Sequence, residues 1–427
     1  MAAILAVFLL LSVITSYSTR LKYGPDEPAH YIYVRSIAQD FAFPELSHEI
    51  TPTEDSASTH QAQHPPLYYA LAAIPYFAFD HLGADGDAIW RVLRLFTILI
   101  GLGWIYFTYR LAREFFPHDD LAVLTTTGLV ALMPGGTYTC GVINNDAQIA
   151  LTCTCALWMM LIALRRNEMS LRLAVWLGVV IGLAILTKAQ GLTLIPTLVV
   201  AAVVIAKRNS WKGSGVIAGR TAIALGVAAA VSGWWFVRNI IVYGEPIVQS
   251  LYNPAVNTDP ISLVAQPLVL LPMLTQISKQ FLMCFWTPFW LIKPFVNEDI
   301  YFRLLLALSF LGVIGTLMCM ARPRPEHNNR CLAASYLVPL LPGVLIYVMV
   351  IYQTLFVDRG LFQQGRLLLP VAGVLAIWLV GGLRRLVPQK AAVCVFATLL
   401  AGALIGNVFT IRLIRMFYRV VEPGAGP

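Results

Sequence analysis

Charged residues are scarce in this chain, and their scarcity excludes an ordinary soluble domain. Asp, Glu, Lys and Arg together make up 12% of the 427 residues, against about a quarter in a typical soluble domain. Hydrophobic residues make up 58%, and the mean hydropathy is +0.72. Apolar runs long enough to cross a bilayer recur along the whole chain. We therefore expect an all-α polytopic membrane protein, because a helix satisfies its own backbone hydrogen bonds in lipid.

Several other sequence features are missing. The seven cysteines include no Cys-x-x-Cys pair, and most lie inside apolar runs, as Cys153 and Cys319 do. This favours buried free thiols over a zinc site or a disulfide framework. The chain has no fixed-period repeat and no low-complexity segment. Its net charge is +8, but no basic stretch alternates with aromatic residues, so we expect no nucleic-acid partner.

About eleven apolar segments have the length of membrane-spanning helices. They are 2–17, 90–110, 121–137, 146–164, 172–187, 190–206, 216–236, 302–320, 332–356, 367–383 and 391–411. We expect one transmembrane domain over 1–411 and a short tail over 412–427. The first segment lacks the basic start and the cleavage site of a signal peptide, so we expect it to be retained as a helix.

Basic loops predict how the chain lies in the bilayer. Five of them carry Arg110 and Arg113; Arg165, Arg166 and Arg172; Lys207, Arg208 and Lys212; Arg322, Arg324 and Arg330; and Arg384, Arg385 and Lys390. With eleven spans, all five loops share one side, which the positive-inside rule assigns to the cytoplasm. Two long loops, at about 18–89 and 243–301, then lie outside. The basic C-terminal stretch IRLIRMFYRVV opposes this trend, since eleven spans place it outside as well.

The long loops contain candidate interfacial helices. In the first loop these are DEPAHYIYVRSIA and HPPLYYALAAIPYFAF, and in the second the aromatic stretch FLMCFWTPFWLIKPF. Aromatic and amphipathic composition of this kind suits a helix lying in the membrane interface.

Polar side chains gather at the external ends of the expected spans, where charges are costly and usually functional. In chain order they are Asp26, Glu27, His64, Asn144, Asn145, Asp146, Lys188, Arg238, Asn239, Asp358, Arg359 and Arg366. Carboxylates and several cations on one face predict a site for a phosphate-bearing substrate together with a general base.

Each of these residues also has a structural interpretation. Asp26 or Glu27 would cap the helix that begins at Pro28. Lys188 and Arg238 would extend to the membrane interface, where neighbouring tryptophans are common.

The remaining pairs have structural interpretations too. Arg366 would pair with Asp358, and Asn145 and Asp146 would form an ordinary turn. The common sidedness of all these residues is what favours a shared site.

Histidines concentrate in the first long loop, which holds His30, His48, His60, His64 and His81. With carboxylates nearby, they leave a divalent metal open. No pair has a recognised ligand spacing, so we expect that no cofactor is required.

Six stretches resemble, in order, motifs of the C-type membrane glycosyltransferases, which include protein O-mannosyltransferases and lipid A aminoarabinose transferases. They are PDEPAHYIYVRSIA, QHPPLYYAL, NNDA, LTKAQGL, WWFVRNIIVYGEP and QGRLLLP. The resemblance implies a glycosyltransferase in a bacterial inner membrane that moves a single sugar from a polyprenyl-phosphate donor to an acceptor hydroxyl at the external face. The alternative is a lipid or sugar transporter, which the missing internal repeat disfavours.

The resemblance also implies roles for individual residues. Asp26 would be the catalytic acid-base residue, and His64 would lie near the lipid phosphate. From the residues themselves, we expect Glu27, which does not share a helix face with Asp26, to orient Asp26 or hold a sugar hydroxyl. We expect the substrate and its phosphate to be bound by His64, Tyr68, Asn145, Asp146, Lys188, Arg238 and Arg366. The aminoarabinose transferases carry Glu-Lys where Gln63-His64 stands here, which replaces a permanent cation by a titratable group and puts a metal ligand at this position in doubt.

The chemistry suits these residue types. A phosphate ester leaves when cations stabilise its charge, and an acceptor hydroxyl needs a carboxylate base. One base opposite a set of cations predicts inversion by a single displacement, whereas retention would need a second carboxylate as nucleophile. With only a short tail after 411, we expect a lipid-linked or membrane-proximal acceptor.

Overall fold

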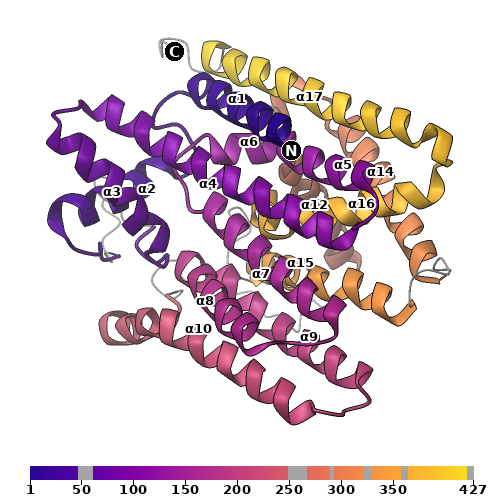
Figure 1. Ribbon diagram of the computed structural model, residues 1–427. Coiled ribbons are helices and arrows are strands. Elements are labelled where there is room, and N and C mark those ends of the chain that lie inside the picture. Colours follow the sequence, from indigo (N-terminus) through magenta and orange to yellow (C-terminus); the bar gives the residue numbers. More distant parts are fainter. Residues whose placement is uncertain (47–60, 249–266, 289–292, 322–328, 357–363, 421–427) are drawn as a thin grey trace.

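The computed structural model describes residues 1–46, 61–248, 267–288, 293–321, 329–356 and 364–420, and within them every regular element is helical (Figure 1). The longer helices are α1 (Ala2–Ser18), α2 (Glu27–Arg35), α3 (Leu67–His81), α4 (Gly86–Phe115), α5 (Asp120–Ala131), α6 (Pro134–Cys140), α7 (Asp146–Arg166), α8 (Leu171–Thr187), α9 (Leu194–Arg208), α10 (Ser214–Tyr243), α12 (Pro267–Trp286), α14 (Glu298–Ala321), α15 (Asn329–Phe356), α16 (Ala372–Leu386) and α17 (Gln389–Val420). Short turns of 3₁₀ or π-helix complete them at η1 (Ser36–Asp40), η3 (Ala189–Thr193), η4 (Lys293–Phe295) and η5 (Gly365–Val371). The expected all-α membrane fold is confirmed.

The eleven expected spans all fall on helices. Eight helical segments of the described chain are long and apolar enough to cross a membrane, and the bent pair α5 and α6 makes a ninth if it is one span. The other two, α1 and α8, are apolar but only 17 residues long. The span count therefore stays a prediction. The last helix continues to Val420, past the expected boundary at 411, because α17 carries its arginines without a helix-breaking residue.

Both candidate interfacial segments of the first long loop are helices, α2 with η1 and then α3. They lie together at one end of the bundle, where α1 also ends (Figure 1). Stacked aromatic rings hold them there. The rings of Tyr33 and Tyr69 are 3.8 Å apart between centroids, and Tyr31 stacks on Trp90 of α4 at 4.1 Å. Stacked pairs of this kind add to the energy of burial.

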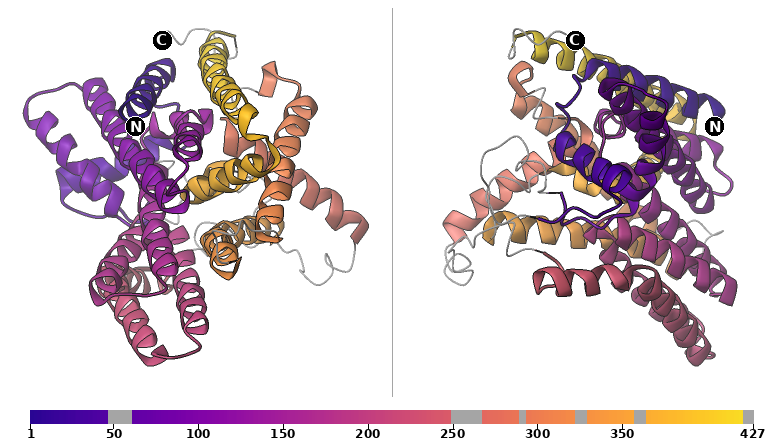
Figure 2. Two further views of the ribbon diagram at one scale, coloured as in Figure 1. Left: turned by 45° about the vertical axis from the view of Figure 1, so that its right-hand side comes forward. Right: turned by 90° about the vertical axis from the view of Figure 1, so that its left-hand side faces the viewer.

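Helix α7 lies at the centre of the fold (Figures 1 and 2). It packs against α4, α8, α9, α15 and η5, and its residues join the largest buried apolar cluster. Cys153 of this helix is a buried free thiol, as expected, and so is Cys140. Because α7 begins at Asp146, this central helix carries a carboxylate at one end of the bundle.

Small residues allow the closest helix contacts. A Cβ on Gly315 of α14 would lie 2.1 Å from the carbonyl oxygen of Gly382 on α16, and one on Gly178 of α8 would lie 2.4 Å from the carbonyl oxygen of Ala224 on α10. Helices in lipid associate through such backbone approaches rather than through the hydrophobic effect.

A buried ion pair ties the first helices together. Arg94 of α4 and Glu27 of α2 have side chains only 2% and 0% exposed. The Arg94 Nε and Nη2 groups donate to the two Glu27 oxygens, each at 2.7 Å. Its remaining N–H groups donate to the carbonyl oxygens of Ser16, Thr19 and Arg20 at 2.7 to 2.9 Å. All five guanidinium donors are thus used, and three of them bond to carbonyls at and just after the end of α1, where helix carbonyls lack partners within the helix.

We predict that Arg94→Met lowers the free energy of unfolding by about 3–5 kcal/mol, because it leaves the Glu27 carboxylate buried without its partner. Chemical denaturation in detergent micelles measures this. Arg166→Met, exposed at the end of α7, is the matched control and should change the same quantity by no more than about 0.5 kcal/mol. Equal losses in the two variants would contradict the structural role of Arg94.

Candidate active site

Asp26 occupies a left-handed backbone conformation at the start of α2, with φ 58° and ψ 13°. Asp is among the few residues that tolerate this region. Two residues earlier, only glycine fits at position 24, because a Cβ there would lie 2.9 Å from both the Glu27 carboxylate and Val142, too close for either contact. Asp26 is at the N-cap position, but its side chain makes no capping hydrogen bond. The Asp26 carboxylate is therefore not held by capping of α2.

Asp26 instead begins a row of four alternating charges. Arg366 Nη2 donates to Asp26 Oδ2 at 2.9 Å, and Arg366 Nε lies 3.4 Å from Asp146 Oδ2. Lys188 Nζ then donates to Asp146 Oδ1 at 2.6 Å. The side chain of Asp146 is 2% exposed, whereas that of Asp26 is 36% exposed. The structure thus joins four residues that are separated by up to 340 positions in the chain, and Asp26 is the member most open to a reactant.

Local sequence explains how each member reaches the row. Asn144 Oδ1 accepts from the Asp146 backbone N–H at 2.8 Å, which shapes the turn into α7 as Asn commonly does. Lys188 has an extended backbone at the break between α8 and η3. Arg366 follows Gly365, where a Cβ would lie 2.0 Å from the backbone nitrogen of Phe285. Only glycine permits η5 to approach α12 this closely.

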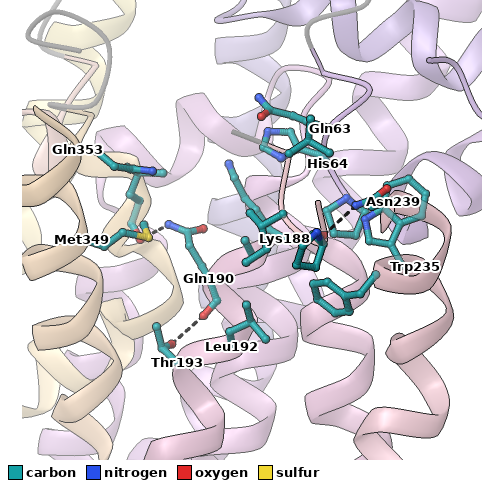
Figure 3. A pocket seen from close by; sticks show the side chains of 17 residues that line it. Gln63, His64, Lys188, Gln190, Leu192, Thr193, Trp235, Asn239, Met349 and Gln353 are labelled. Carbon is teal, nitrogen blue, oxygen red and sulfur yellow. Dashed lines mark hydrogen bonds between the residues drawn. The ribbon is translucent and has the colours of Figure 1, made fainter. Parts of the chain in front are cut away.

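A cavity of about 320 Å³ adjoins the row at Lys188. Figure 3 shows His64 and Gln63 on one side of it, Gln190 and Met349 on another, and Trp235 with Asn239 opposite. Its walls are mostly apolar, with a few polar groups, which is the usual composition of a small-molecule or lipid site. Gln190 Nε2 donates to the Leu367 carbonyl at 3.0 Å, and its Oε1 is buried with no partner among the described residues.

Two histidines lie close to these charges. Burial lowers the pKa of His30 to about 3, against the opposing effect of the Asp26 carboxylate, and the ring Nδ1 shares a hydrogen bond with the Tyr69 hydroxyl at 2.9 Å. Burial, and then the Lys188 charge, also lower the pKa of His64 well below its usual value. Both rings are therefore neutral at physiological pH. His64 borders the cavity as a neutral hydrogen-bonding group rather than a cation.

Glu27 lies apart from the row. Besides Arg94, its carboxylate accepts from the backbone N–H groups of Gly24 and Ile143, each at 3.0 Å. With 0% exposure and both oxygens occupied, it has no lone pair positioned for a substrate. The structure therefore corrects the idea that Glu27 holds a sugar hydroxyl, because its carboxylate is enclosed and serves as an internal support.

Three other expected site residues are also outside the row. Tyr68 is buried and bonds to Thr97 at 2.6 Å. Arg238 lies over the rings of Trp235 and Tyr243, with its guanidinium carbon 5.0 and 5.2 Å from their centroids. It therefore supports the cavity wall that Trp235 forms.

Asn145 is fully buried at the start of α7. Its Nδ2 donates to the Thr187 carbonyl at 3.4 Å, next to Lys188, and its Oδ1 has no partner among the described residues.

The structural alternatives can now be compared with the geometry. Lys188 is 12% exposed and paired with Asp146, so it does not extend to the interface. Arg366 pairs with Asp26 and Asp146, while Asp358 lies outside the described residues. Sequence reasoning missed Arg94, although a charge within an apolar span was a signal for it.

A metal site does not emerge from the described residues, which include no group of three or more His, Cys, Asp or Glu side chains placed to hold an ion. Asp26 and Asp146 pair with Arg366 and Lys188 in this structure. His48 and His60 lie outside the described residues.

The chain is similar to known proteins, in sequence over one segment and in fold over nearly its whole length. Residues 63–234 match the family described as dolichyl-phosphate-mannose-protein mannosyltransferase. A search of curated proteins by sequence finds no match.

Among solved structures, ArnT from Cupriavidus metallidurans bound to undecaprenyl phosphate has a TM-score of 0.55 at 15% identity, covering 97% of this chain and 74% of that one. The Archaeoglobus fulgidus oligosaccharyltransferase in complex with Zn and sulfate has a TM-score of 0.54 at 14% identity, covering 97% of this chain and 52% of that one. The present chain thus spans about half the length of the archaeal enzyme. The chain therefore shares its fold with these two proteins along nearly its whole length, and its residues 63–234 match the mannosyltransferase family in sequence.

Proposed function

We propose that this protein is an inverting glycosyltransferase that moves one sugar from a polyprenyl-phosphate donor to an acceptor hydroxyl. The observation that carries the proposal is the row Asp26, Arg366, Asp146 and Lys188 beside an apolar cavity. The family match to a dolichyl-phosphate-mannose enzyme and the undecaprenyl phosphate bound to ArnT support a lipid-phosphate donor. The acceptor is lipid-linked or membrane-proximal.

The reaction breaks the bond between the sugar's anomeric carbon and the phosphate oxygen, and forms a bond to the acceptor oxygen. Asp26 takes the acceptor proton, and the lipid phosphate leaves with the bonding electrons. Asp26 suits the base role because it is the exposed end of the row. Glu27 is enclosed by Arg94, and Asp146, the other carboxylate near Asp26, is 2% exposed and paired with both Arg366 and Lys188. Neither is open to act as a nucleophile, which supports a single displacement.

Lys188 and Arg366 stabilise the departing phosphate. Asp146 touches both cations, so it acts as a positioning residue that holds them at a fixed separation before the donor arrives. Charges held in place in a site of low dielectric stabilise a transition state without paying for reorganisation during the reaction. Neutral His64 donates or accepts a hydrogen bond at the cavity wall.

We further propose that the site faces the exterior of a bacterial inner membrane. The support is the positive-inside pattern of the five basic loops. The Arg165 and Arg166 pair ends α7 at the helix terminus opposite Asp146, so basic loop and site lie at opposite ends of this helix.

Asp26→Asn should lower sugar transfer by about a hundredfold to ten-thousandfold, because it removes the general base, while donor binding persists. The measurement is transfer by purified protein from a panel of labelled polyprenyl-phosphate sugars. Asp85→Asn is the matched control, since Asp85 is an exposed N-cap that accepts from Ala88 N–H at 2.7 Å and Asn caps about as well as Asp. Near-normal transfer by Asp26→Asn would refute the base role.

Arg366→Lys should reduce turnover by about tenfold or more, because lysine cannot reproduce the forked contact of a guanidinium with two carboxylates and a phosphate. Arg384→Lys is its control. Arg384 pairs with Asp119 at 2.9 Å near the far end of α16, so it tests the same substitution in an ion pair away from the site. If both variants turned over equally, Arg366 would have no special role.

Donor affinity should stay flat between about pH 6 and 8. An ordinary histidine gains its charge as the pH falls through about 6.5, but the lowered pKa of His64 moves that protonation to more acidic conditions. His64→Gln should therefore leave the shape of this profile unchanged. Titration of donor binding at several pH values measures it. An affinity that rose on acidification in the wild type but not in His64→Gln would mean that His64 acts as a cation.

A further inference from the structure

A second cavity, of about 580 Å³, lies where α1 ends, α4 begins and α17 ends. Figure 1 shows α1 and α17 side by side at this position, and the second view of Figure 2 agrees. Five cations line the cavity against one acid, Asp87; the cations are Arg20, Lys22, Arg91, Arg415 and Arg419. The glycosyl transfer proposed above uses none of these residues.

Aromatic rings and a hydroxyl, rather than carboxylates, hold three of these cations. The Arg91 guanidinium carbon lies 4.8 Å from the centroid of the Tyr17 ring, and Lys22 Nζ lies 6.0 Å from that of Trp90. Arg415 Nε donates to the Ser18 hydroxyl at 2.9 Å. Within the described parts of the chain Lys22, Arg91 and Arg415 form no ion pair, unlike Arg94, Lys188, Arg366 and Arg384.

The backbone here is also held in an uncommon conformation. Lys22 has a φ of 73°, a region that residues other than glycine rarely occupy. Five cations beside a single lining acid, Asp87, repel one another, so a bound anion stabilises such a cluster. Guanidinium groups that keep their terminal N–H groups available match the oxygens of a phosphate.

The position of the cavity indicates which kind of molecule carries that phosphate. Residues 19–25 lead from the end of α1 directly to Asp26, so the cavity lies at the same end of the bundle as the row of four charges. The flanking helix surfaces are apolar and exposed, including Leu10 at 58% and Tyr17 and Val420 at 65%. A polar, cationic hollow at the end of exposed apolar helices has the arrangement of a lipid headgroup with its acyl chains.

We propose that this cavity binds the phosphate headgroup of an anionic membrane lipid, whose chains lie along α1 and α17. The site is separate from the one that transfers sugar, and its ligand is held by Arg91, Arg415 and Lys22. It also accounts for the basic end of α17, which the sidedness of the other basic loops leaves unexplained.

The test is a binding titration of the purified full-length protein in neutral detergent. The probes are dioctanoyl phosphatidate, dioctanoyl phosphatidylcholine and inorganic phosphate. The wild type should bind phosphatidate more tightly than the other two. The double substitution Arg91→Gln with Arg415→Gln should weaken phosphatidate binding by about thirtyfold, since each basic residue near an anionic surface typically contributes about fivefold.

Two further variants keep the result interpretable. Arg166→Gln with Arg172→Gln removes two exposed cations elsewhere in the fold and should leave binding unchanged. Arg91→Lys with Arg415→Lys keeps the charge but not the guanidinium fork, and should weaken phosphatidate binding less than the glutamine pair does, which guards against a folding defect in the glutamine variant. Equal losses in both glutamine pairs, or no loss in either, would overturn the proposed site. Binding of inorganic phosphate as tight as that of phosphatidate would overturn the assignment to a lipid.

Discussion

The five hydrogen bonds of the Arg94 guanidinium are the constraint on which the site depends. They join the end of α1, the start of α2 and the body of α4 through one buried group. Glu27, its partner, also accepts from Ile143 in the turn that precedes α7. The residue next to Glu27 is Asp26 and the helix after that turn begins at Asp146. The buried ion pair is therefore bonded to both chain segments whose carboxylates hold Arg366.

The two adjacent acids, Asp26 and Glu27, therefore have different environments. Buried ion pairs contribute little net stability compared with apolar packing, but losing one partner is costly. Glu27 is enclosed and inaccessible, whereas Asp26 is left at the edge in a left-handed conformation. Strained backbone of this kind persists only where the surroundings over-determine it. The support of Glu27 by Arg94 and by two backbone N–H groups is what over-determines it here.

Sequence reasoning predicted the helical membrane fold and eleven apolar segments that all fall on helices. It also named, among its candidates, four residues that do meet: Asp26, Asp146, Lys188 and Arg366. Hydropathy made the helices readable, because lipid leaves few alternatives to a helix. It could not separate Glu27 from Asp26, since adjacency in sequence says nothing about which carboxylate meets an arginine 67 residues away. Likewise, sidedness grouped Arg238 with the other cations, but only packing shows that it lies over Trp235. Which side chains far apart in the sequence contact each other depends on how the helices pack, and composition and hydropathy do not reveal that packing.

The close approach at Gly365 has a mechanical consequence. The glycine lies against the backbone of α12 from Phe281 to Phe285, with no room for a side chain between them, and Arg366 is the next residue. A displacement of α12 along its axis would therefore carry the guanidinium with it and change its reach to Asp26. Helix α12 belongs to the second long loop, far in sequence from α2. Arg366 thus connects the two long loops. A ligand that displaced α12 would move Arg366 relative to Asp26, the carboxylate proposed to activate the acceptor.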